Sequence, residues 1–317
     1  MYLDELIRLD SQNPGTDYAG ITDFLEKRLL DAGASVLHVG KNLFAKWGKP
    51  ELLLNAHMDT VKAAGWKSNP LEPVARGGRV FGLGSADTKG NIHAVLQAIK
   101  SGPDDLAVLF SVDEEFGART GVQAFAETRL LKGLRRAIVL EPTDNKVVTS
   151  HPGYYAFELA FSGRAGHSSL AAKNAVLNAC ESVSALSKHF GTRFSAGKIS
   201  SNSGDSSATA GECVATVSVR AYDGYRTVTS AVRQLSPSAR VKALQAGPPF
   251  NNPLPFIPGN AEAGFWTDAA ILSERGLNAV VYGAGSVSQA HAPGESVSLS
   301  SIKKCESFIQ TAIGEYS

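Results

Sequence analysis

Residues 51–59 read ELLLNAHMD, an almost continuous apolar run that ends in a histidine and an aspartate. A run of this kind is typical of a strand that is buried on both faces of a sheet. LAVLFSVD at 106–113 and AIVL at 137–140 are two further apolar runs, and helix-like segments separate the three. We therefore expect an α/β fold with a mixed, largely parallel sheet that is flanked by helices.

The segments around these runs complete this pattern. Apolar residues at helical spacing predict helices at 2–10, 18–32 and 91–101, and short strands are expected at 35–39 and 42–47. Near the C-terminal end the same style returns, with a helix at 267–276, a strand at 277–285 and a helix at 298–315. Both ends of the chain thus belong to one α/β domain.

The middle of the chain has a different character. YYAFELAFSG at 154–163 alternates between apolar and polar residues, which predicts a half-exposed strand. An amphipathic helix at 173–190 and later segments suggest a β-α-β-β-α-β-like order, which ends near the Pro-, Gly- and Asn-rich stretch GPPFNNPLPFIPGN. We expect an inserted α+β domain at 152–247, and a discontinuous domain made of residues 1–151 and 248–317.

Composition excludes several classes of protein. Of the 317 residues, 43% are hydrophobic and 19% are charged, and the net charge of +1 favours neither nucleic acid nor an anionic membrane as a partner. The three cysteines, Cys180, Cys213 and Cys305, are widely spaced and form no CxxC pair, which indicates reduced thiols. The sequence shows no signal peptide and no apolar run long enough to span a membrane, so we expect a cytoplasmic protein.

Metal-ligand residue types follow the apolar runs. In sheets of this kind ligands gather at the carboxyl ends of the strands, so these side chains are expected to converge. Two histidines and several carboxylates without thiolates suit zinc, with cobalt or manganese as substitutes. The residues concerned are His57, Asp87 in the turn GLGSADTKG, Glu114, Glu115, Glu141 and His291.

Neighbouring carboxylates suggest a division of roles. Asp59 lies two residues after His57, so in an extended segment both side chains point the same way. It is placed to accept the second imidazole N–H of His57 and so to fix its orientation. Glu114 and Glu115 are adjacent and point apart, which lets one bind metal while the other faces water.

Six motifs occur in an order that resembles one known family. HMDTV, GLGSADTKG, SVDEEFG, EPT, GRAGHSS and GSVSQAHAPGE are similar to the acetylornithine deacetylase / succinyl-diaminopimelate desuccinylase family of di-zinc amidohydrolases. The resemblance covers nearly the whole chain and is strongest to the acetylornithine deacetylase branch. It implies cleavage of the amide bond of a small N-acyl amino acid, most directly N-acetylornithine in arginine biosynthesis.

The resemblance also implies roles for individual residues. Asp87 would bridge two Zn²⁺ ions and Glu114 would act as the general base. In the inserted domain, which resembles the family's lid and homodimerisation domain, His167 would stabilise the oxyanion and Arg220 would bind the substrate α-carboxylate. The implied ligand sets are His57 and Glu141 at one ion, and Glu115 and His291 at the other.

The sequence departs from the family in one place and leaves alternatives open. Many relatives carry an Asn before the strand of Arg220, where this chain has Ser207, and pocket shape does not transfer because the chain is shorter. Succinyl-diaminopimelate desuccinylase, acetylcitrulline deacetylase and small-peptide exopeptidase are the alternative activities. A catalytically inactive metal-binding dimer is the alternative of a different class. The loop around Asp87 lacks the GK[ST] ending and the third glycine that nucleotide-binding motifs require, and the chain has no GxSxG motif.

Overall fold

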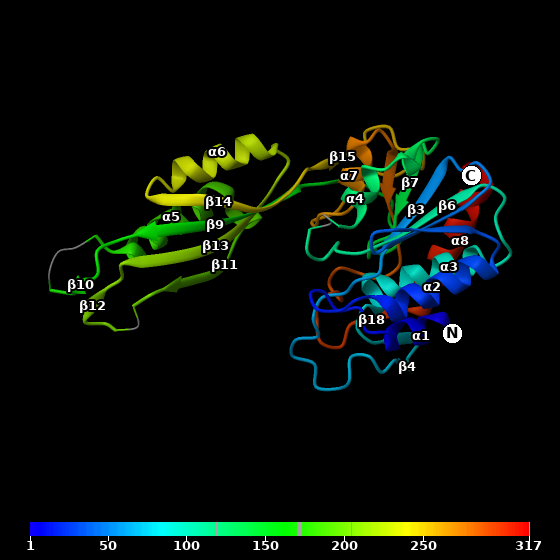
Figure 1. The fold of residues 1–317 in the computed structure, drawn as a ribbon, viewed down its shortest axis with the longest axis horizontal. Helices are drawn as coiled ribbons and strands as arrows, with labels where there is room; N and C mark the ends of the chain where they lie inside the picture. Colours follow the sequence, from blue (N-terminus) through cyan, green and yellow to red (C-terminus); the bar gives the residue numbers. More distant parts are fainter. Residues whose placement is uncertain (118–119, 170–172, 204, 317) are drawn as a thin grey trace. The chain divides into compact units, whose positions relative to one another are not determined.

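The computed structural model describes residues 1–117, 120–169, 173–203 and 205–316 (Figure 1). The chain divides into two compact units. The first consists of Met1–Ser150, Asn251–Ala263 and Thr267–Ser317, and the second of His151–Phe250 and Gly264–Trp266. The second unit therefore takes in the short segment Gly264–Trp266, which the sequence pattern places with the other domain.

A nine-stranded mixed sheet forms the centre of the first unit. Its four middle strands, in the order β6-β3-β7-β17, are parallel to one another, and β1 and β2 join one side in antiparallel pairs. The sequence prediction of a mixed, largely parallel sheet is confirmed. The strands in sheet order are β1 (Ser35–Val39), β2 (Asn42–Trp47), β6 (Leu106–Ser111), β3 (Leu52–His57), β7 (Arg136–Val139), β17 (Asn278–Val281), β8 (Val148–His151) and β15 (Phe250–Asn251), and β16 (Ala261–Glu262) pairs with β8.

Helices cover this sheet because its middle strands are apolar on both faces. Every residue of β3 and of β6 is buried. One group of helices packs on the face that carries Leu52 and Leu54, and α4 and α7 pack together near β7 and β17. The first group is α1 (Tyr2–Arg8), α2 (Ala19–Asp31), α3 (Gly90–Ala98) and α8 (Leu299–Tyr316); the other helices are α4 (Val122–Ala126), α7 (Ala269–Glu274) and the 3₁₀ turn η2 (Arg129–Leu131).

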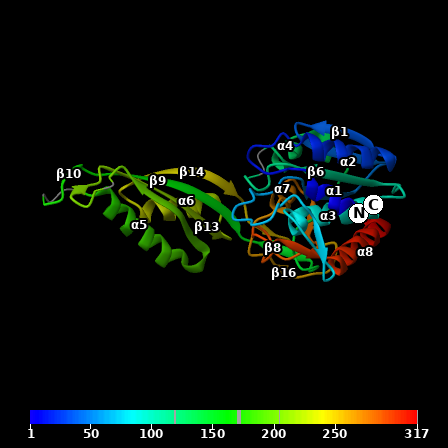
Figure 2. The same ribbon diagram turned by 90° about the horizontal axis from the view of Figure 1, so that it is seen from below.

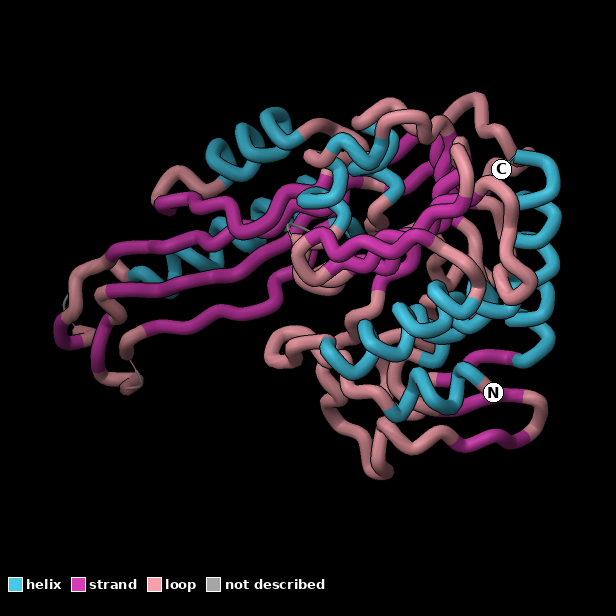
Figure 3. Tube along the Cα trace, turned by 45° about the vertical axis from the view of Figure 1, so that its right-hand side comes forward, coloured by secondary structure: helices cyan, strands magenta, loops and turns pink. Residues whose placement is uncertain are grey.

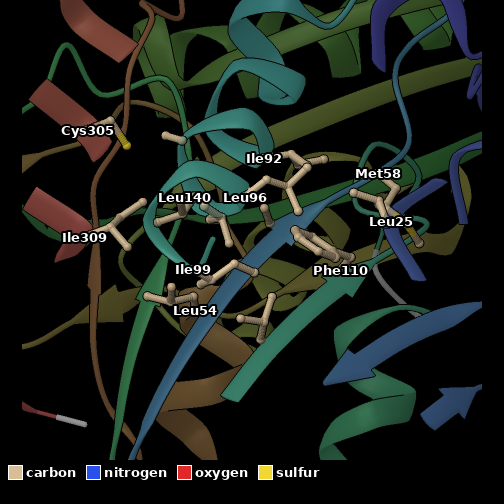
Figure 4. Packing of buried hydrophobic residues seen from close by; sticks show 14 of the residues in the cluster. Leu25, Leu54, Met58, Ile92, Leu96, Ile99, Phe110, Leu140, Cys305 and Ile309 are labelled. Atoms are coloured by element: carbon tan, nitrogen blue, oxygen red, sulfur yellow. The ribbon is translucent and has the colours of Figure 1, made fainter. Parts of the chain in front are cut away.

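The core between the sheet and α3 fixes the strands that lead to the site. Leu54 of β3, Phe110 of β6, Ile92 and Leu96 of α3 and Ile309 of α8 belong to one buried cluster (Figure 4). These side chains are fully or almost fully buried. Truncating one such side chain typically costs about 2–5 kcal/mol, so the strand ends rest on a rigid support.

A small three-stranded sheet lies beside this core, in the order β18-β5-β4. Its strands are β4 (Val74–Arg76), β5 (Arg79–Phe81) and β18 (Ser296–Ser298). The antiparallel pair β5 and β18 joins two segments that are far apart in sequence: β5 leads into the turn η1 (Ser85–Lys89), and β18 follows the loop that carries His291. The sequence pattern did not predict this sheet.

The second unit contains a four-stranded antiparallel sheet in the order β11-β13-β9-β14, whose strands are labelled in Figure 1, and the helices α5 and α6 (Figure 2). Alternate residues of β13, from Cys213 to Ala221, point inward and are buried, as amphipathic strands require. Helix α5 packs on β9, β11 and β13, and α6 packs on β14 and α5 (Figure 3). The elements are β9 (Gly153–Ser162), β10 (Gly166–His167), α5 (Ala175–Phe190), η3 (Gly191–Arg193), β11 (Phe194–Ser201), β12 (Ala208–Thr209), β13 (Glu212–Ala221), α6 (Tyr225–Leu235) and β14 (Ala239–Gly247).

Among the described helices, none has both the length and the apolar character that crossing a bilayer needs.

Candidate active site

The carboxyl ends of the four parallel strands bring the predicted metal-ligand residues to one edge of the first unit. His57 is the last residue of β3 and lies opposite Ser111, the last residue of β6. Glu115 follows β6, and Glu141 follows β7 by two residues. Because neighbouring parallel strands end at the same edge, side chains from distant parts of the sequence meet there.

Asp87 lies between the two histidines. Its Oδ1 is 3.0 Å from Nε2 of His57, and its Oδ2 is 3.4 Å from Nε2 of His291. Each carboxylate oxygen therefore faces a different imidazole. This is the arrangement that a carboxylate shared between two cations needs.

One further carboxylate lies beside each histidine. The two carboxylate oxygens of Glu115 are 3.1 and 3.0 Å from Nε2 of His291, and an oxygen of Glu141 is 3.9 Å from Nε2 of His57. Possible ligand atoms of His57, Asp87 and Glu115 all lie within 4.8 Å of one another. The five predicted ligand residues thus form two adjoining groups that share Asp87.

The imidazole of His57 is held from its other side by Asp59, but through a different atom than the sequence pattern predicted. Nδ1 of His57 lies 2.9 Å from the backbone carbonyl of Asp59, whereas the Asp59 carboxylate is 3.6 Å away. That carboxylate accepts hydrogen bonds from the side chain of Asn13 and, at 3.4 and 3.3 Å, from the backbone N–H groups of Glu114 and Glu115. Asp59 therefore connects the β3 end to the loop that carries both glutamates.

The electrostatics of this edge favour bound cations. Burial raises the pKa of Glu114 well above its usual range, and the carboxyl groups of Glu141 and Glu115 raise it further. Burial likewise raises the pKa of Glu141. Hydrogen bonds to Asp87 and Glu115 raise the pKa of His291 to about 10. Closely packed buried carboxyl groups are stabilised by positive charge, and N and O donors without thiolates suit zinc, so these residues fit two divalent ions.

Several hydrogen bonds fix the backbone on either side of Asp87. Thr88 Oγ1 donates to the carbonyl of Leu140, one residue before Glu141. Asn91 donates to Thr88 Oγ1 and accepts from the N–H of Ala284, at the end of β17. The carboxylate of Glu295, which is 2% exposed, accepts from three N–H groups of this turn.

Asp268 is a further buried acid near this edge, at the start of α7. It is 1% exposed, and its Oδ2 lies 3.4 Å from the hydroxyl of Ser111. Within the described part of the chain its Oδ1 has no hydrogen-bond partner. Burial raises the pKa of Asp268 to about 7, and the carboxyl group of Asp268 in turn raises the pKa of Glu114.

The other two candidate residues, His167 and Arg220, belong to the second unit. His167 is exposed on β10, and its Nδ1 accepts from the backbone N–H of Ser169, which leaves Nε2 to carry the proton and to donate. Arg220 is half-buried near the end of β13, with its guanidinium carbon 5.1 Å from the ring centre of Tyr154 on β9. Ser207 lies beside the His167 segment: its backbone carbonyl accepts a hydrogen bond from the N–H of Ser168.

The structure thus brings together His57, Asp59, Asp87, Glu114, Glu115, Glu141 and His291 in one unit. Three buried groups at this edge were missed: Asn13, Asp268 and Glu295. Each lies in a short segment that is typical of a turn or of the start of a helix, namely NPG, TDA and PGE. The sequence alone therefore does not distinguish them from surface residues.

Comparisons with known proteins agree with this fold. N-acetyl-L-citrulline deacetylase of Xanthomonas campestris pv. campestris is 29% identical over 96% of this chain and 94% of its own length. Acetylornithine deacetylase of Myxococcus xanthus is 26% identical over 99% of this chain and 96% of its own length. Among solved structures, a metallo-carboxypeptidase from Sulfolobus solfataricus has a TM-score of 0.81 at 16% identity, covering 99% of this chain and 98% of that one.

A family model described as Peptidase family M20/M25/M40 matches residues 53–315. A dinuclear metal-binding peptidase of this family from Bacillus subtilis has the same fold, with a TM-score of 0.74 at 11% identity, 99% coverage of this chain and 96% of that one. The matched residues begin within β3 and end within α8, so they include both units. The chain is a metal-dependent hydrolase that belongs to Peptidase family M20/M25/M40.

Proposed function

We propose that this protein hydrolyses the amide bond of a small N-acyl amino acid, with N-acetylornithine as the first substrate to test. The observation that carries the proposal is the pair of side-chain groups centred on Asp87, whose two oxygens each face a different histidine. Relatives named as deacetylases of acetylated amino acids align over nearly the whole chain, which supports this class of substrate. N-acetylcitrulline is the second candidate, because the relative that is 29% identical acts on it by name.

Two Zn²⁺ ions are the proposed cofactors, with Co²⁺ or Mn²⁺ as substitutes. His57 and Glu141 would hold one ion, Glu115 and His291 the other, and Asp87 would bind both. When bound, such ions polarise the amide carbonyl and make water more acidic. In this reaction the chain's own residues must orient the ligands and move protons.

Glu114 is the proposed general base. Its neighbour Glu115 faces His291, so the two adjacent side chains have separate tasks. Glu114 would take a proton from the attacking water on its carboxylate and later return it to the leaving amine nitrogen. Burial, which raises its pKa in the protein without metal, favours uptake of the proton; bound cations act in the opposite direction, favour the carboxylate and so help the return of the proton.

Asp59 is proposed to orient His57. The backbone carbonyl of Asp59 accepts from Nδ1 of His57, which fixes Nε2 toward Asp87. The carboxylate of Asp59 at the same time holds the N–H groups of Glu114 and Glu115. Substituting Asp59 is therefore expected to disturb ligands and base together.

The roles of His167 and Arg220 stay predictions. An exposed imidazole with a free Nε2–H suits donation to an oxyanion, and a guanidinium suits bidentate binding of an α-carboxylate. A homodimer formed through the second unit and a cytoplasmic location are further proposals. The free state of Cys180, Cys213 and Cys305 is what a reducing compartment would give.

A substrate panel tests the proposal directly. The metal-free protein would be reconstituted with two equivalents of zinc. It would be assayed for release of acetate from N-acetylornithine and N-acetylcitrulline, of succinate from N-succinyl-diaminopimelate, and of free amino acids from a dipeptide. We expect hydrolysis of an acetylated amino acid that a chelator abolishes and zinc restores. Chelator-sensitive cleavage of the dipeptide alone would identify an exopeptidase. Absence of cleavage despite binding of two zinc ions would favour the non-catalytic alternative.

A further inference from the structure

Glu295 connects the two loops that carry Asp87 and His291. It lies four residues after His291, immediately before β18, and it is 2% exposed. Its Oε2 accepts from the N–H of Gly84 at 2.8 Å. Its Oε1 accepts from the N–H groups of Ala86 at 2.8 Å and of Asp87 itself at 2.9 Å.

The backbone ties the same two loops together. The N–H of Gly82 donates to the carbonyl of Glu295 at 3.1 Å, and the pairing of Ser296 with Phe81 continues this contact into the β5–β18 ladder. The carboxylate of Glu295 thus adds side-chain hydrogen bonds between two segments that are more than 200 residues apart in the sequence. Next to these hydrogen bonds, one segment carries Asp87 and the other carries His291 of the candidate metal centre.

The chemistry of the turn explains why a carboxylate is needed at this position. Three N–H groups converge from one turn, and they are buried or partly buried. One carboxylate has two acceptor oxygens, with lone pairs enough for all three N–H groups. A Gln side chain has only one acceptor oxygen, so its NH₂ group would face the N–H of one of these residues.

The position of Asp87 depends on this contact. Its Oδ1 and Oδ2 reach His57 and His291 at 3.0 and 3.4 Å, and its own N–H is one of the three bound by Glu295. A shift of the turn would therefore move Asp87 away from one histidine or the other. Because Glu295 also belongs to the loop of His291, it controls the relative position of two proposed ligands at once.

We propose that Glu295 is a positioning residue of the metal centre, which sets Asp87 against His291 through three backbone hydrogen bonds without touching metal or substrate. This inference rests on the proposed function of Asp87 and His291 as ligands. Outer partners of metal ligands typically change metal affinity by about 10- to 100-fold when they are substituted.

Binding of Co²⁺ to the full-length, metal-stripped protein tests the inference without relying on catalysis. Glu295→Gln would be compared with the unmodified protein for the Co²⁺ dissociation constants and for the visible absorption spectrum, which reports coordination geometry. Glu51→Gln is the matched control: Glu51 lies just before β3, at the opposite end of the strand from His57, and pairs with Arg135 and Arg136. Thermal unfolding of each metal-free variant measures the purely structural contribution.

We expect Glu295→Gln to weaken Co²⁺ binding by about 10- to 100-fold and to change the spectrum, while Glu51→Gln leaves both unchanged. Glu295→Asp, which keeps the charge but is one methylene shorter, should recover part of the affinity, and it serves as the test if the Gln variant does not fold. Wild-type affinity and spectrum in a folded Glu295 variant, whatever its thermal stability, would overturn the inference. If the unmodified protein itself binds no Co²⁺, the proposed function fails instead.

Discussion

The two units hold their chemically important side chains in different ways. In the first unit, His57 and Glu141 are 2% and 4% exposed, and hydrogen bonds fix the backbone around Asp87. In the second unit, His167 is exposed on a two-residue strand and Arg220 lies on the sheet face away from the helices. The first unit therefore carries a group of side chains that is arranged before any substrate binds, whereas the proposed roles of His167 and Arg220 require a molecule that reaches them.

This difference separates two kinds of substitution. Variants of ligands and their supports in the first unit should change metal binding, and turnover as a consequence. Variants in the second unit should change turnover or substrate binding and leave the metals in place. Metal binding and hydrolysis, measured separately, distinguish the two kinds of substitution.

The largest expected effect is that of Glu114→Gln. The substitution keeps the shape of the side chain but removes the proton acceptor, and general bases contribute up to about 10⁴-fold to rates. We expect hydrolysis to fall by about this factor while two equivalents of zinc remain bound, because Glu115 and not Glu114 faces His291. Hydrolysis at the wild-type rate would show that Glu114 is not the base, and loss of one zinc would make it a ligand.

A smaller effect is expected for His167→Ala in the second unit. Loss of one oxyanion donor typically lowers kcat by about 100- to 1000-fold. Metal affinity should not change, since the second unit is not part of the metal centre proposed here. Ser169→Ala removes the hydroxyl that lies 2.8 Å from Nδ1 of His167 but keeps the backbone N–H that donates to Nδ1, so it should lower kcat less than His167→Ala. A change in zinc stoichiometry with His167→Ala would contradict the separation between the two units.

Asp59→Asn should lower metal affinity by about 10- to 100-fold. The backbone carbonyl that holds Nδ1 of His57 remains, but one carboxylate oxygen becomes an NH₂ group that faces the donor groups of Asn13 and of the glutamate loop. Competition with a chromophoric chelator measures the affinity. Asn13→Ala leaves the carboxylate in place and should have the weaker effect. Equal loss in both variants would show that Asn13 and Asp59 act only as a pair.

The sequence predicted the first unit better than the second, for a physical reason. Strands β3, β6 and β7 are mostly apolar because both faces are covered, and such apolar runs can be recognised in the sequence. Their ends then point to His57, Glu115 and Glu141. Strand β11 has no apolar run of this kind, because it is exposed along almost its whole length.

The site was also predicted unevenly. Asp59 was predicted to accept from His57 through its carboxylate; in the structure the backbone carbonyl of Asp59 lies nearer to Nδ1, at 2.9 Å, and the carboxylate, at 3.6 Å, also binds Asn13 and two N–H groups. Glu295 and Asp268 were missed because their burial depends on the pairing of β5 with β18 and on the placement of α7, contacts over long sequence separations. His167 and Arg220 could be named only from family resemblance, since no local pattern distinguishes them from surface residues.

The smallest expected effect is a loss of stability at acidic pH that is caused by His93, a histidine of the first unit outside the metal centre. It tests whether side chains of this unit are tightly buried away from the site as well. His93 is 5% exposed on α3, its Nδ1 has no hydrogen-bond partner among the described residues, and the Tyr2 ring lies against it. Burial lowers the pKa of His93 from 6.5 to about 4; the nearby N-terminal amine also lowers it, while Glu306 and Asp4 partly oppose the shift. The unfolded chain therefore binds a proton between pH 6.5 and 4 that the folded chain does not, and this part of the stability is lost as the pH falls through that range.

At pH 5.5, one unit below the ordinary pKa, the loss should be about 1.4 kcal/mol. Urea unfolding of the metal-free protein at pH 7.5 and 5.5 measures it, with His93→Leu as the variant that cannot take up the proton. Other groups titrate equally in both proteins, so the difference between them isolates His93. An equal loss of stability in both proteins would mean that His93 is protonated in the folded state. The environment of α3 would then be more accessible to water than the metal-binding edge.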